Sequence, residues 1–468
     1  MVARIESIAA FLKPRVLPLI GAVCVFSIMA KADLWSTAYY AGWMQSYMPA
    51  SNVDFTALSH VIHFSVVPDT DGTLNSSANG LTTGNSADVV ARVHAAGRKA
   101  LVCVGGAGSQ AGFQGATSSA NLSTFINNLT NFMANRSYDG VDLDWEPLNA
   151  SDSMQYTNLV NGLRTALNGF SPHKLLTAAV GAYPPYGDPP TAQYAMFAML
   201  QSQFDQINVM TYDLSGPYAG WVTWFNSPIY DGGYRFPSTG GLVPSTDFAV
   251  SNFISAGVTS GKLGIGIAFY GWLWSGGSGT STGGAALPRQ TWTTAPVASQ
   301  PTYYAIMSTY YQSNLYHWDT DAQAAYLSID NPGSNNDRFI SYDDEHTCQA
   351  KVSYARNRSL GGVMIWELGS GFRATQPAGQ RDPLLQAVKQ SLATPGAAAV
   401  KISGNDINLS FSSLPLAFYR ILWTSNLTSA TWNTLTNNVP GTGGILQITD
   451  PGTVTNQLQR FYRIKTPP

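Results

Sequence analysis

The stretch YDGVDLDWEP at residues 138–147 indicates the fold and the chemistry of this chain. It places four acidic residues within eight positions, although charged residues make up only 11% of the whole sequence. Asp142, Asp144 and Glu146 alternate with apolar residues, which is the two-residue period of a strand whose faces differ in polarity. The three acids therefore share one face of the predicted strand. At ~3.3 Å per residue they lie about 6.6 Å apart along the backbone, so a rotamer change brings Asp144 toward either neighbour.

The acidic face allows three interpretations. A solvated acidic strand would not need apolar residues on its other face. A hard-metal site is a stronger alternative, because clustered carboxylates bind calcium or magnesium. However, the segment lacks the glycine turn and the alternating oxygen ligands of a calcium loop. Buried carboxyl groups at this spacing cannot all ionise cheaply, so one keeps its proton, as general acid catalysis requires. We therefore favour a catalytic site without a metal ion or cofactor.

The spacing of Asp139, Asp142, Asp144 and Glu146 resembles the D-x-x-D-x-D-x-E signature of the family-18 glycoside hydrolases, the chitinase family. The resemblance implies a secreted enzyme that cleaves β-1,4 links between N-acetylglucosamine units with retention of configuration. Two alternatives stay open. A chitin-binding lectin on the same barrel is disfavoured because the acidic residue is present. An endo-N-acetylglucosaminidase acting on N-glycan cores is disfavoured by the long insertion described below.

Short apolar runs alternate with helical patterns from residue 33 onward, as in repeated βαβ units. The predicted strands are residues 36–43, 60–66, 100–104, 140–145, 175–180, 206–211, 263–268 and 362–366. Eight such units predict an α/β fold, a (β/α)8 TIM barrel, over residues 33–392. Active sites of these barrels lie at the C-terminal ends of the strands, where Glu146 follows the fourth strand.

Two further parts are predicted beyond the barrel units. Residues 273–340 are too long for an ordinary connection and are rich in tyrosine, so they predict an inserted α+β subdomain. By resemblance, this insertion forms one wall of the substrate groove. Residues 393–399 form a linker, and residues 400–468 predict a small all-β domain in which the tetrapeptide Phe-Tyr-Arg-Ile occurs twice.

Three aromatic residues of the C-terminal domain allow two interpretations. Trp423, Trp432 and Tyr462 are either a sugar-stacking platform or the core of the domain. Residues of this kind are more often the core of a small sandwich. A carbohydrate-binding role is therefore the less favoured of the two.

The first 32 residues predict an export signal, because basic residues precede the apolar run 16–29 and a small-x-small cleavage motif ends at Ala32. Cleavage changes the net charge from −2 to about −5, since four basic residues and one acidic residue leave. This charge argues against nucleic acid or an anionic membrane as a partner. Only Cys103 and Cys348 would remain, too few for a disulfide framework. We expect an extracellular monomer whose partner is chitin or chitooligosaccharides.

The resemblance also implies the roles of the catalytic residues. Glu146 protonates the glycosidic oxygen and later activates water, while Asp144 orients the acetamido group of the substrate, in a substrate-assisted mechanism. Asp142 holds the proton or charge that lets Asp144 turn, and Tyr212 donates a hydrogen bond to the acetamido oxygen. Asp139 is expected to be structural.

The ends of the other predicted strands supply the remaining site residues by resemblance. The substrate-binding residues are Tyr39, Phe64, Met210, Asp213, Tyr218 and Trp366. Trp366 is expected to be the hydrophobic floor under the sugar being cleaved. Gly105 and Gly106 belong to the motif of the third strand and are expected to be structural.

Four residues depart from the family pattern. Cys103 stands where serine is usual, and a thiol is a weaker hydrogen-bond donor than a hydroxyl, so the network around Asp142 is expected to be weaker. Ala107 and Tyr218 each stand where the family often has tryptophan, and Trp272 stands where arginine is common. These departures predict altered affinity on the leaving-group side and an unaltered chemical step.

Overall fold

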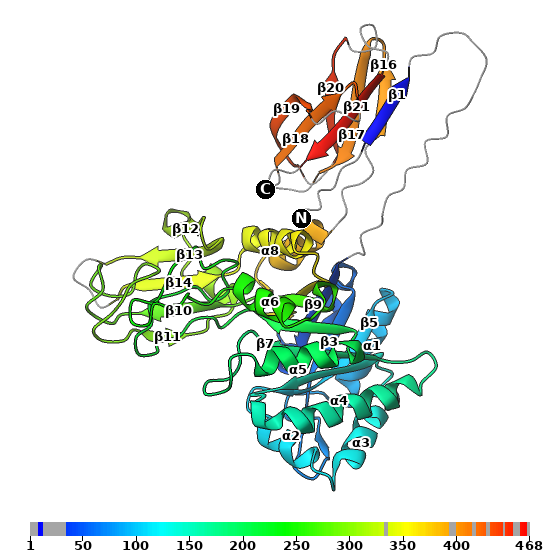
Figure 1. Cartoon of the computed structure of the whole chain (residues 1–468), viewed down its shortest axis with the longest axis vertical. Coiled ribbons are helices and arrows are strands. Elements are labelled where there is room, and N and C mark those ends of the chain that lie inside the picture. The colour runs from blue at the N-terminus through cyan, green and yellow to red at the C-terminus, as the bar shows by residue number, and fades with distance from the viewer. Residues whose placement is uncertain are drawn as a thin grey trace. The chain divides into compact units, whose positions relative to one another are not determined.

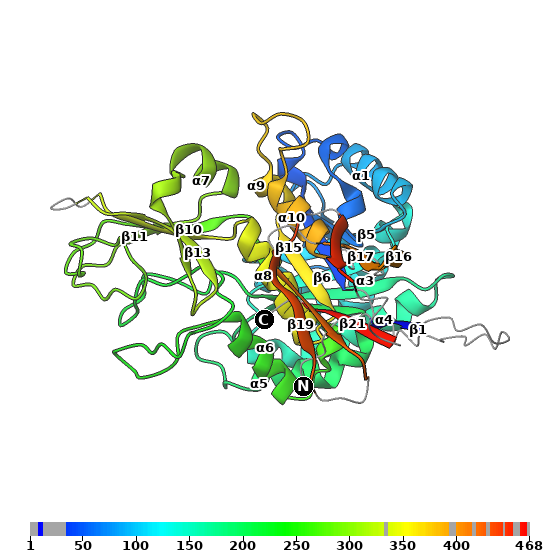
Figure 2. The same cartoon turned by 90° about the horizontal axis from the view of Figure 1, so that it is seen from above.

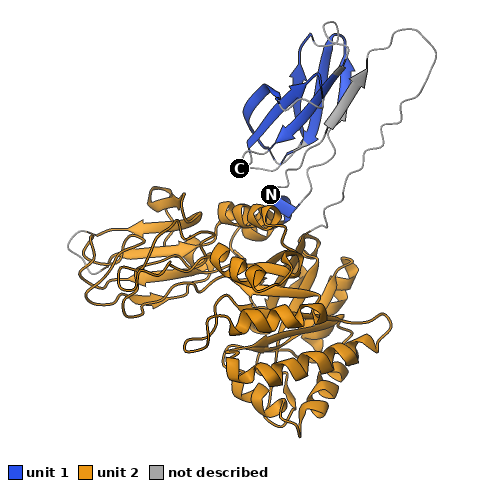
Figure 3. Ribbon diagram, in the orientation of Figure 1, with its two compact units in different colours: residues 1–33, 389–468 blue, residues 34–388 orange. Residues whose placement is uncertain are grey.

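The computed structural model describes residues 8–12, 34–331, 336–392, 399–413, 418–426, 431–442, 445–452 and 459–465. The chain divides into two compact units (Figure 3). One consists of residues 34–388, and the other consists of residues 389–468 together with those before residue 34. The predicted linker lies largely outside the described residues.

The larger unit is built on a closed barrel of eight parallel strands, as predicted (Figure 1). In barrel order these are β2 (Trp35–Ala41), β3 (His60–Pro68), β5 (Lys99–Gly106), β6 (Gly140–Trp145), β7 (Leu175–Gly181), β8 (Gln206–Met210), β9 (Leu263–Ala268) and β15 (Gly362–Trp366). Pairing of β2 with both β15 and β3 closes the barrel. The first strand ends two residues earlier than predicted, because residues 42–44 form a 3-10 turn. A short strand β4 (Leu74–Asn75) pairs antiparallel with β3.

Helices surround the strands in both views (Figures 1 and 2). They are α1 (Thr83–Ala95), α2 (Gln110–Ala116), α3 (Leu122–Asn135), α4 (Ser153–Asn168), α5 (Ala192–Leu200), α6 (Thr246–Ser255), α8 (Glu345–Asn357), α9 (Leu368–Gly371) and α10 (Pro383–Leu392). Side-chain caps fix several starts: Thr82 accepts from the backbone N–H of Asn85 before α1, and Asp344 accepts from that of Thr347 before α8. Among the described residues, no helix has both the length and the apolar character needed to cross a membrane.

Every residue of β6 is buried, because one face points into the barrel and the other meets the surrounding helices. Val141, Leu143 and Trp145 lie on the helix side, and the Trp145 ring stacks on Phe113 of α2 at 4.6 Å between centroids. Asp142 contacts residues of β2 and β7 inside the barrel. The alternation seen in the sequence thus places the acidic side chains on the face of β6 that points into the barrel.

The insertion is confirmed as an antiparallel sheet with a helix, extending to one side of the barrel (Figure 2). Its strands are β10 (Gly271–Ser275), β11 (Val297–Ser299), β12 (Tyr316–Asp319), β13 (Ala324–Ile329) and β14 (Arg338–Tyr342), and its helix is α7 (Tyr303–Thr309). Its core also contains Trp224 and Phe225, from the connection between β8 and α6. The subdomain therefore combines two segments that are far apart in the sequence.

The C-terminal unit contains two small sheets. One is β1 (Ile8–Leu12), β21 (Gln459–Lys465), β18 (Phe418–Thr424) and β19 (Asn433–Pro440), and the other is β16 (Ala399–Ser403), β17 (Asp406–Ser412) and β20 (Ile445–Asp450). The two copies of Phe-Tyr-Arg-Ile lie on β18 and β21, which pair antiparallel. The two copies of the tetrapeptide therefore lie on neighbouring strands. Strand β1 falls inside the predicted export signal, whose other residues lie outside the described ones, so export stays a prediction.

The aromatic residues of this unit are arranged as follows. Tyr462 is buried in the core, and its hydroxyl donates to Asp450 at 2.6 Å. The guanidinium group of Arg460 covers the Trp423 ring at 3.5 Å, while Arg463 lies over Trp432 at 4.2 Å. Each tryptophan therefore has one face occupied by an arginine, and a sugar-binding role for the unit stays a prediction.

Candidate active site

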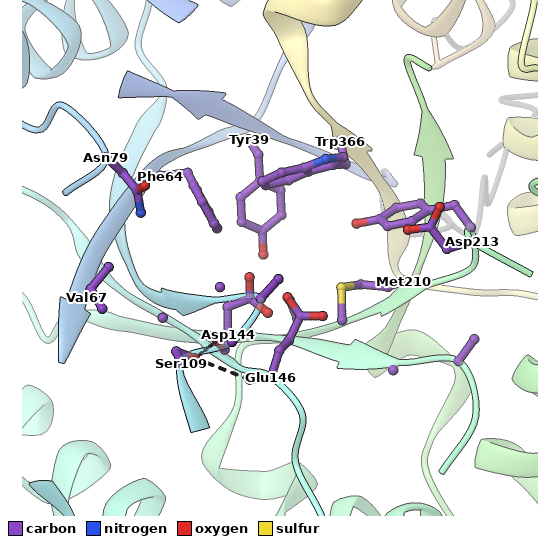
Figure 4. A pocket seen from close by; sticks show the side chains of 18 of the residues that line it. Tyr39, Phe64, Val67, Asn79, Ser109, Asp144, Glu146, Met210, Asp213 and Trp366 are labelled. Carbon is purple, nitrogen blue, oxygen red and sulfur yellow. Dashed lines mark hydrogen bonds between the residues drawn. The ribbon is translucent and has the colours of Figure 1, made fainter. Parts of the chain in front are cut away.

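A cavity of about 620 Å³ opens at the C-terminal ends of the barrel strands. From the predicted set it brings together Tyr39, Phe64, Gly105, Gly106, Asp144, Glu146, Met210, Tyr212, Asp213 and Trp366. Figure 4 shows Tyr39, Phe64 and Trp366 on one side, facing Asp144 and Glu146. Residues that follow different strands thus meet in one hollow, as expected for a barrel of this kind.

Asp142 lies below the cavity and is completely buried. Its carboxylate accepts hydrogen bonds from the hydroxyls of Thr177 at 2.5 Å and Tyr39 at 2.8 Å, and a further one from the thiol of Cys103. Burial raises the pKa of Asp142 to about 6, while the three donors act in the opposite direction because they favour the charged form. The three donors thus hold the Asp142 carboxylate in one position.

Asp144 is in a different situation one step along the strand. Among the described residues, its carboxyl group has a single hydrogen-bond partner, the carboxyl group of Glu146, and receives no bond from an N–H or hydroxyl group. Burial raises its pKa, and the nearby charges of Glu146 and Asp142 raise it further. Two carboxyl groups in contact share a proton. The Asp144 carboxyl group therefore already points toward Glu146. Its Oδ1 atom accepts no hydrogen bond from the described residues.

Glu146 is partly exposed to the cavity, and burial of its carboxyl group raises its pKa. Its backbone is held by the segment after β5 (Figure 4). The Glu146 N–H donates to the hydroxyl of Ser109 at 3.4 Å, and its carbonyl accepts from the N–H of Gln110 at 3.2 Å. The side-chain amides of Gln110 and Gln114 each donate a hydrogen bond of 2.8 Å to the carboxylate of Asp152, which directly precedes α4. Backbone contacts thus hold Glu146 in place, and its side chain lines the cavity.

Aromatic rings form the opposite wall. Trp366, at the end of β15, lies 4.7 Å from Phe64 and 5.4 Å from Tyr39 between ring centroids, with edge-to-face geometry. Trp43 extends this wall, with its ring 5.6 Å from that of Phe64 and 48% of its surface exposed. Such a wall matches the apolar faces of pyranose rings.

Two glycines allow the close approach of this wall and the acidic strand. A Cβ atom on Gly105 would lie 2.1 Å from the Asp144 carbonyl oxygen, and one on Gly106 would lie 2.6 Å from the Phe64 ring. Both have positive φ angles, of 111° and 113°. Any side chain here would push Asp144 or Phe64 out of place.

Tyr212 completes the carboxyl side of the site. Among the described residues, its hydroxyl has one weak acceptor, the sulfur of Met364 at 3.7 Å. Burial and the surrounding carboxylates raise its pKa, so the phenol keeps its proton. It is therefore available as a donor to a ligand.

Two predicted site residues lie elsewhere. Tyr218 is 58% exposed and packs edge-on against Trp221, outside the residues that line the cavity. Asp139, at the start of β6, accepts from the backbone N–H of Ala100 at 2.9 Å and pairs with His94 and Lys99. Asp139 thus joins the N-terminal end of β6 to β5 and α1, and its structural role stays a prediction.

The departures from the family pattern can now be located. Cys103 is buried beside Asp142, and Thr177 supplies the strong hydroxyl donor that the thiol does not. Ala107 lines the cavity and leaves that side without a ring. Trp272 is directed to the core of the insertion instead of the cavity.

Sequence reasoning missed several residues of the site. Trp43, Asn79, Ser109 and Tyr183 line the cavity, and Thr177 contacts Asp142 from below. Trp43 is the last residue of the predicted first strand, which was a usable signal. The others depend on contacts between distant segments.

A closed barrel with inward carboxyl groups at the end of its fourth strand defines a class of glycoside hydrolases. The chain belongs to the glycosyl hydrolases family 18, which it matches over residues 36–371. It is 30% identical over 357 residues to Chitinase A1 of Niallia circulans, covering 70% of this chain and 46% of that protein. The chain therefore spans slightly less than half the length of this relative.

Two solved structures are similar to the larger unit. The Group IV chitinase of Ostrinia furnacalis in complex with allosamidin has a TM-score of 0.65 at 22% identity, over 77% of this chain and 99% of that one. YKL-39, solved in the presence of chitooligosaccharides, has a TM-score of 0.63 at 25% identity, over 77% of this chain and 100% of that one.

Proposed function

We propose that this protein is a chitinase, hydrolysing β-1,4 links between N-acetylglucosamine units with retention of configuration. The contrast between the two buried aspartates carries the proposal. Asp142 is saturated by protein donors, whereas Asp144 lines the cavity with acceptor capacity to spare. An acetamido N–H is the donor that such a carboxyl group needs. Ligands of the two similar structures, allosamidin and chitooligosaccharides, support this substrate class.

The geometry suits a substrate-assisted reaction. Glu146 donates its proton to the glycosidic oxygen as the bond to the anomeric carbon breaks. The acetamido oxygen of the same sugar attacks that carbon from the opposite face, and Asp144 stabilises the positive charge by accepting the N–H. Glu146, now ionised, takes a proton from a water molecule. The oxygen of that water attacks the anomeric carbon and so opens the cyclic intermediate. Two inversions give net retention.

Neighbouring residues prepare these steps. The phenol of Tyr212 donates to the acetamido oxygen and aims it at the anomeric carbon. Trp366 supports the apolar face of that sugar, with Tyr39 and Phe64 packed behind it. Burial raises the pKa of Glu146, which is the direction that general acid catalysis requires.

Anomer-resolved hydrolysis of an N-acetylglucosamine oligomer tests the proposal. The expected first product is the β-anomer. Release of glycans from a glycoprotein, with oligomers left intact, would indicate an endo-N-acetylglucosaminidase instead. Oligomer binding without turnover would indicate a lectin.

Replacing Cys103 by serine should leave the fold intact and move the acidic limb of the kcat/KM profile to lower pH. A hydroxyl is a stronger donor to Asp142 than a thiol, and it favours the charged form, so the pKa of Asp142 falls below about 6. Asp142 then stays ionised to lower pH. The pH profile of purified wild type and variant is the measurement, and an unmoved limb would contradict it.

We also propose that the protein is exported. Protein collected outside the cells is expected to begin at Asp33, as read by N-terminal sequencing. Extracellular protein that still carries residues 1–32 would exclude cleavage at this site.

A further inference from the structure

Asp213 borders the cavity just after the end of β8, and its backbone is unusual (Figure 4). Its φ angle is +55°, a left-handed conformation that residues other than glycine rarely adopt. The Asp213 N–H donates to the side-chain oxygen of Asn226 at 3.0 Å, and the Asn226 N–H donates to Ser341 at 2.9 Å. A strained residue held in this way at a cavity is typical of functional sites.

The side chain of Asp213 is held from the insertion. The Nε2 atom of Gln300 donates to Asp213 Oδ1 at 2.7 Å, and the Tyr270 hydroxyl also hydrogen-bonds to this carboxyl group. Gln300 lies between β11 and α7, about ninety positions along the chain from Asp213. Among the described residues, no lysine or arginine forms an ion pair with Asp213. Its side-chain partners are therefore neutral, the phenol of Tyr270 and the amide of Gln300.

Resting on the proposed function, we propose that Gln300 is a positioning residue. It holds the Asp213 carboxylate at the edge of the cavity and so fixes the position of the negative charge that faces Glu146. Asp213 has no other side-chain donor from the insertion among the described residues. The insertion thus takes part in tuning the acid.

The charges around Asp213 explain why an amide suits this place. Asp213 faces Glu146, and the phenols of Tyr212 and Tyr270 pack against it. A carboxylate beside Glu146 favours the protonated form of the acid, because a like charge disfavours ionisation. A cation at position 300 would cancel that effect, whereas an amide keeps the carboxylate in place without cancelling it.

Two substitutions of Gln300 separate positioning from charge. Gln300→Leu removes the donor and should lower kcat about tenfold, with a smaller change in KM, because a hydrogen bond to a charged acceptor is lost. Gln300→Lys keeps a donor but adds a positive charge. Its kcat at the optimum should stay near wild type, while the alkaline limb of the pH profile moves to lower pH by a few tenths of a unit or more.

Gln312, an exposed glutamine of the same insertion, provides matched controls. Gln312→Leu and Gln312→Lys should change neither kcat nor the pH profile. Unchanged kinetics of Gln300→Leu would overturn the inference, as would equal losses in both Gln300 variants with an unmoved alkaline limb. Absence of wild-type turnover would instead overturn the proposed function, and this inference with it.

Discussion

Glu146→Gln lowers kcat on N-acetylglucosamine oligomers by at least ~10²–10⁴-fold while oligomer binding remains nearly unchanged. Glutamine has almost the same shape as glutamate but cannot give a proton to the leaving oxygen or take one from water. The backbone contacts of Glu146 with Ser109 and Gln110 do not involve the side chain, so the local fold should persist. Initial rates of oligomer cleavage and calorimetric binding of the uncleaved oligomer measure the two effects.

Glu345→Gln is the matched control for this substitution. Glu345 is also shielded from solvent and accepts a hydrogen bond from Tyr303 at 3.3 Å, but it begins α8 and does not line the cavity. Its replacement should leave kcat within about twofold of wild type, because no reacting atom meets it. Substantial turnover by Glu146→Gln would remove Glu146 from the role of acid.

Lys351→Met destabilises the larger unit by about 3–5 kcal/mol. The Lys351 ammonium is fully buried, 2.5 Å from Asp343 Oδ2 and 2.5 Å from the Ser227 hydroxyl. Asp343 also accepts from the backbone N–H of Ala268 at 2.9 Å, so the pair joins α8, β9 and the end of the insertion. Methionine fills the space but leaves a buried carboxylate without its cation.

Chemical denaturation of wild type and variant measures this loss. The exposed pair of Arg92 and Asp88 on α1 provides the comparison, since their side chains are 44% and 52% exposed. Arg92→Met should cost less than about 1 kcal/mol, because water screens an exposed pair. Equal effects of the two substitutions would show that the buried pair contributes no more than a surface one.

The acidic strand could be predicted because its information is local. The alternation of Asp142, Asp144 and Glu146 with apolar residues fixes both the strand and the face that carries the acids. The eight barrel strands were predictable for the same reason, as short apolar runs between helical patterns. Strand ends then indicated where Tyr212 and Trp366 would lie.

Contacts between distant segments could not be predicted in this way. Thr177 reaches Asp142 from the neighbouring strand, and Gln300 reaches Asp213 across the insertion, yet neither has a distinctive local pattern. The core of the insertion likewise includes Trp224 from an earlier connection. Tyr218 was expected in the site by position, but its ring packs on Trp221 instead.

The two buried thiols have a practical consequence for work with this protein. Cys103 and Cys348 both belong to the larger unit and are completely buried, while Cys24 lies outside the described residues. A thiol-specific dye meets either of them only when the barrel opens, because a buried thiol is shielded from reagents. In protein that lacks residues 1–32, the labelling rate would therefore report opening of the barrel alone, whatever the C-terminal unit does.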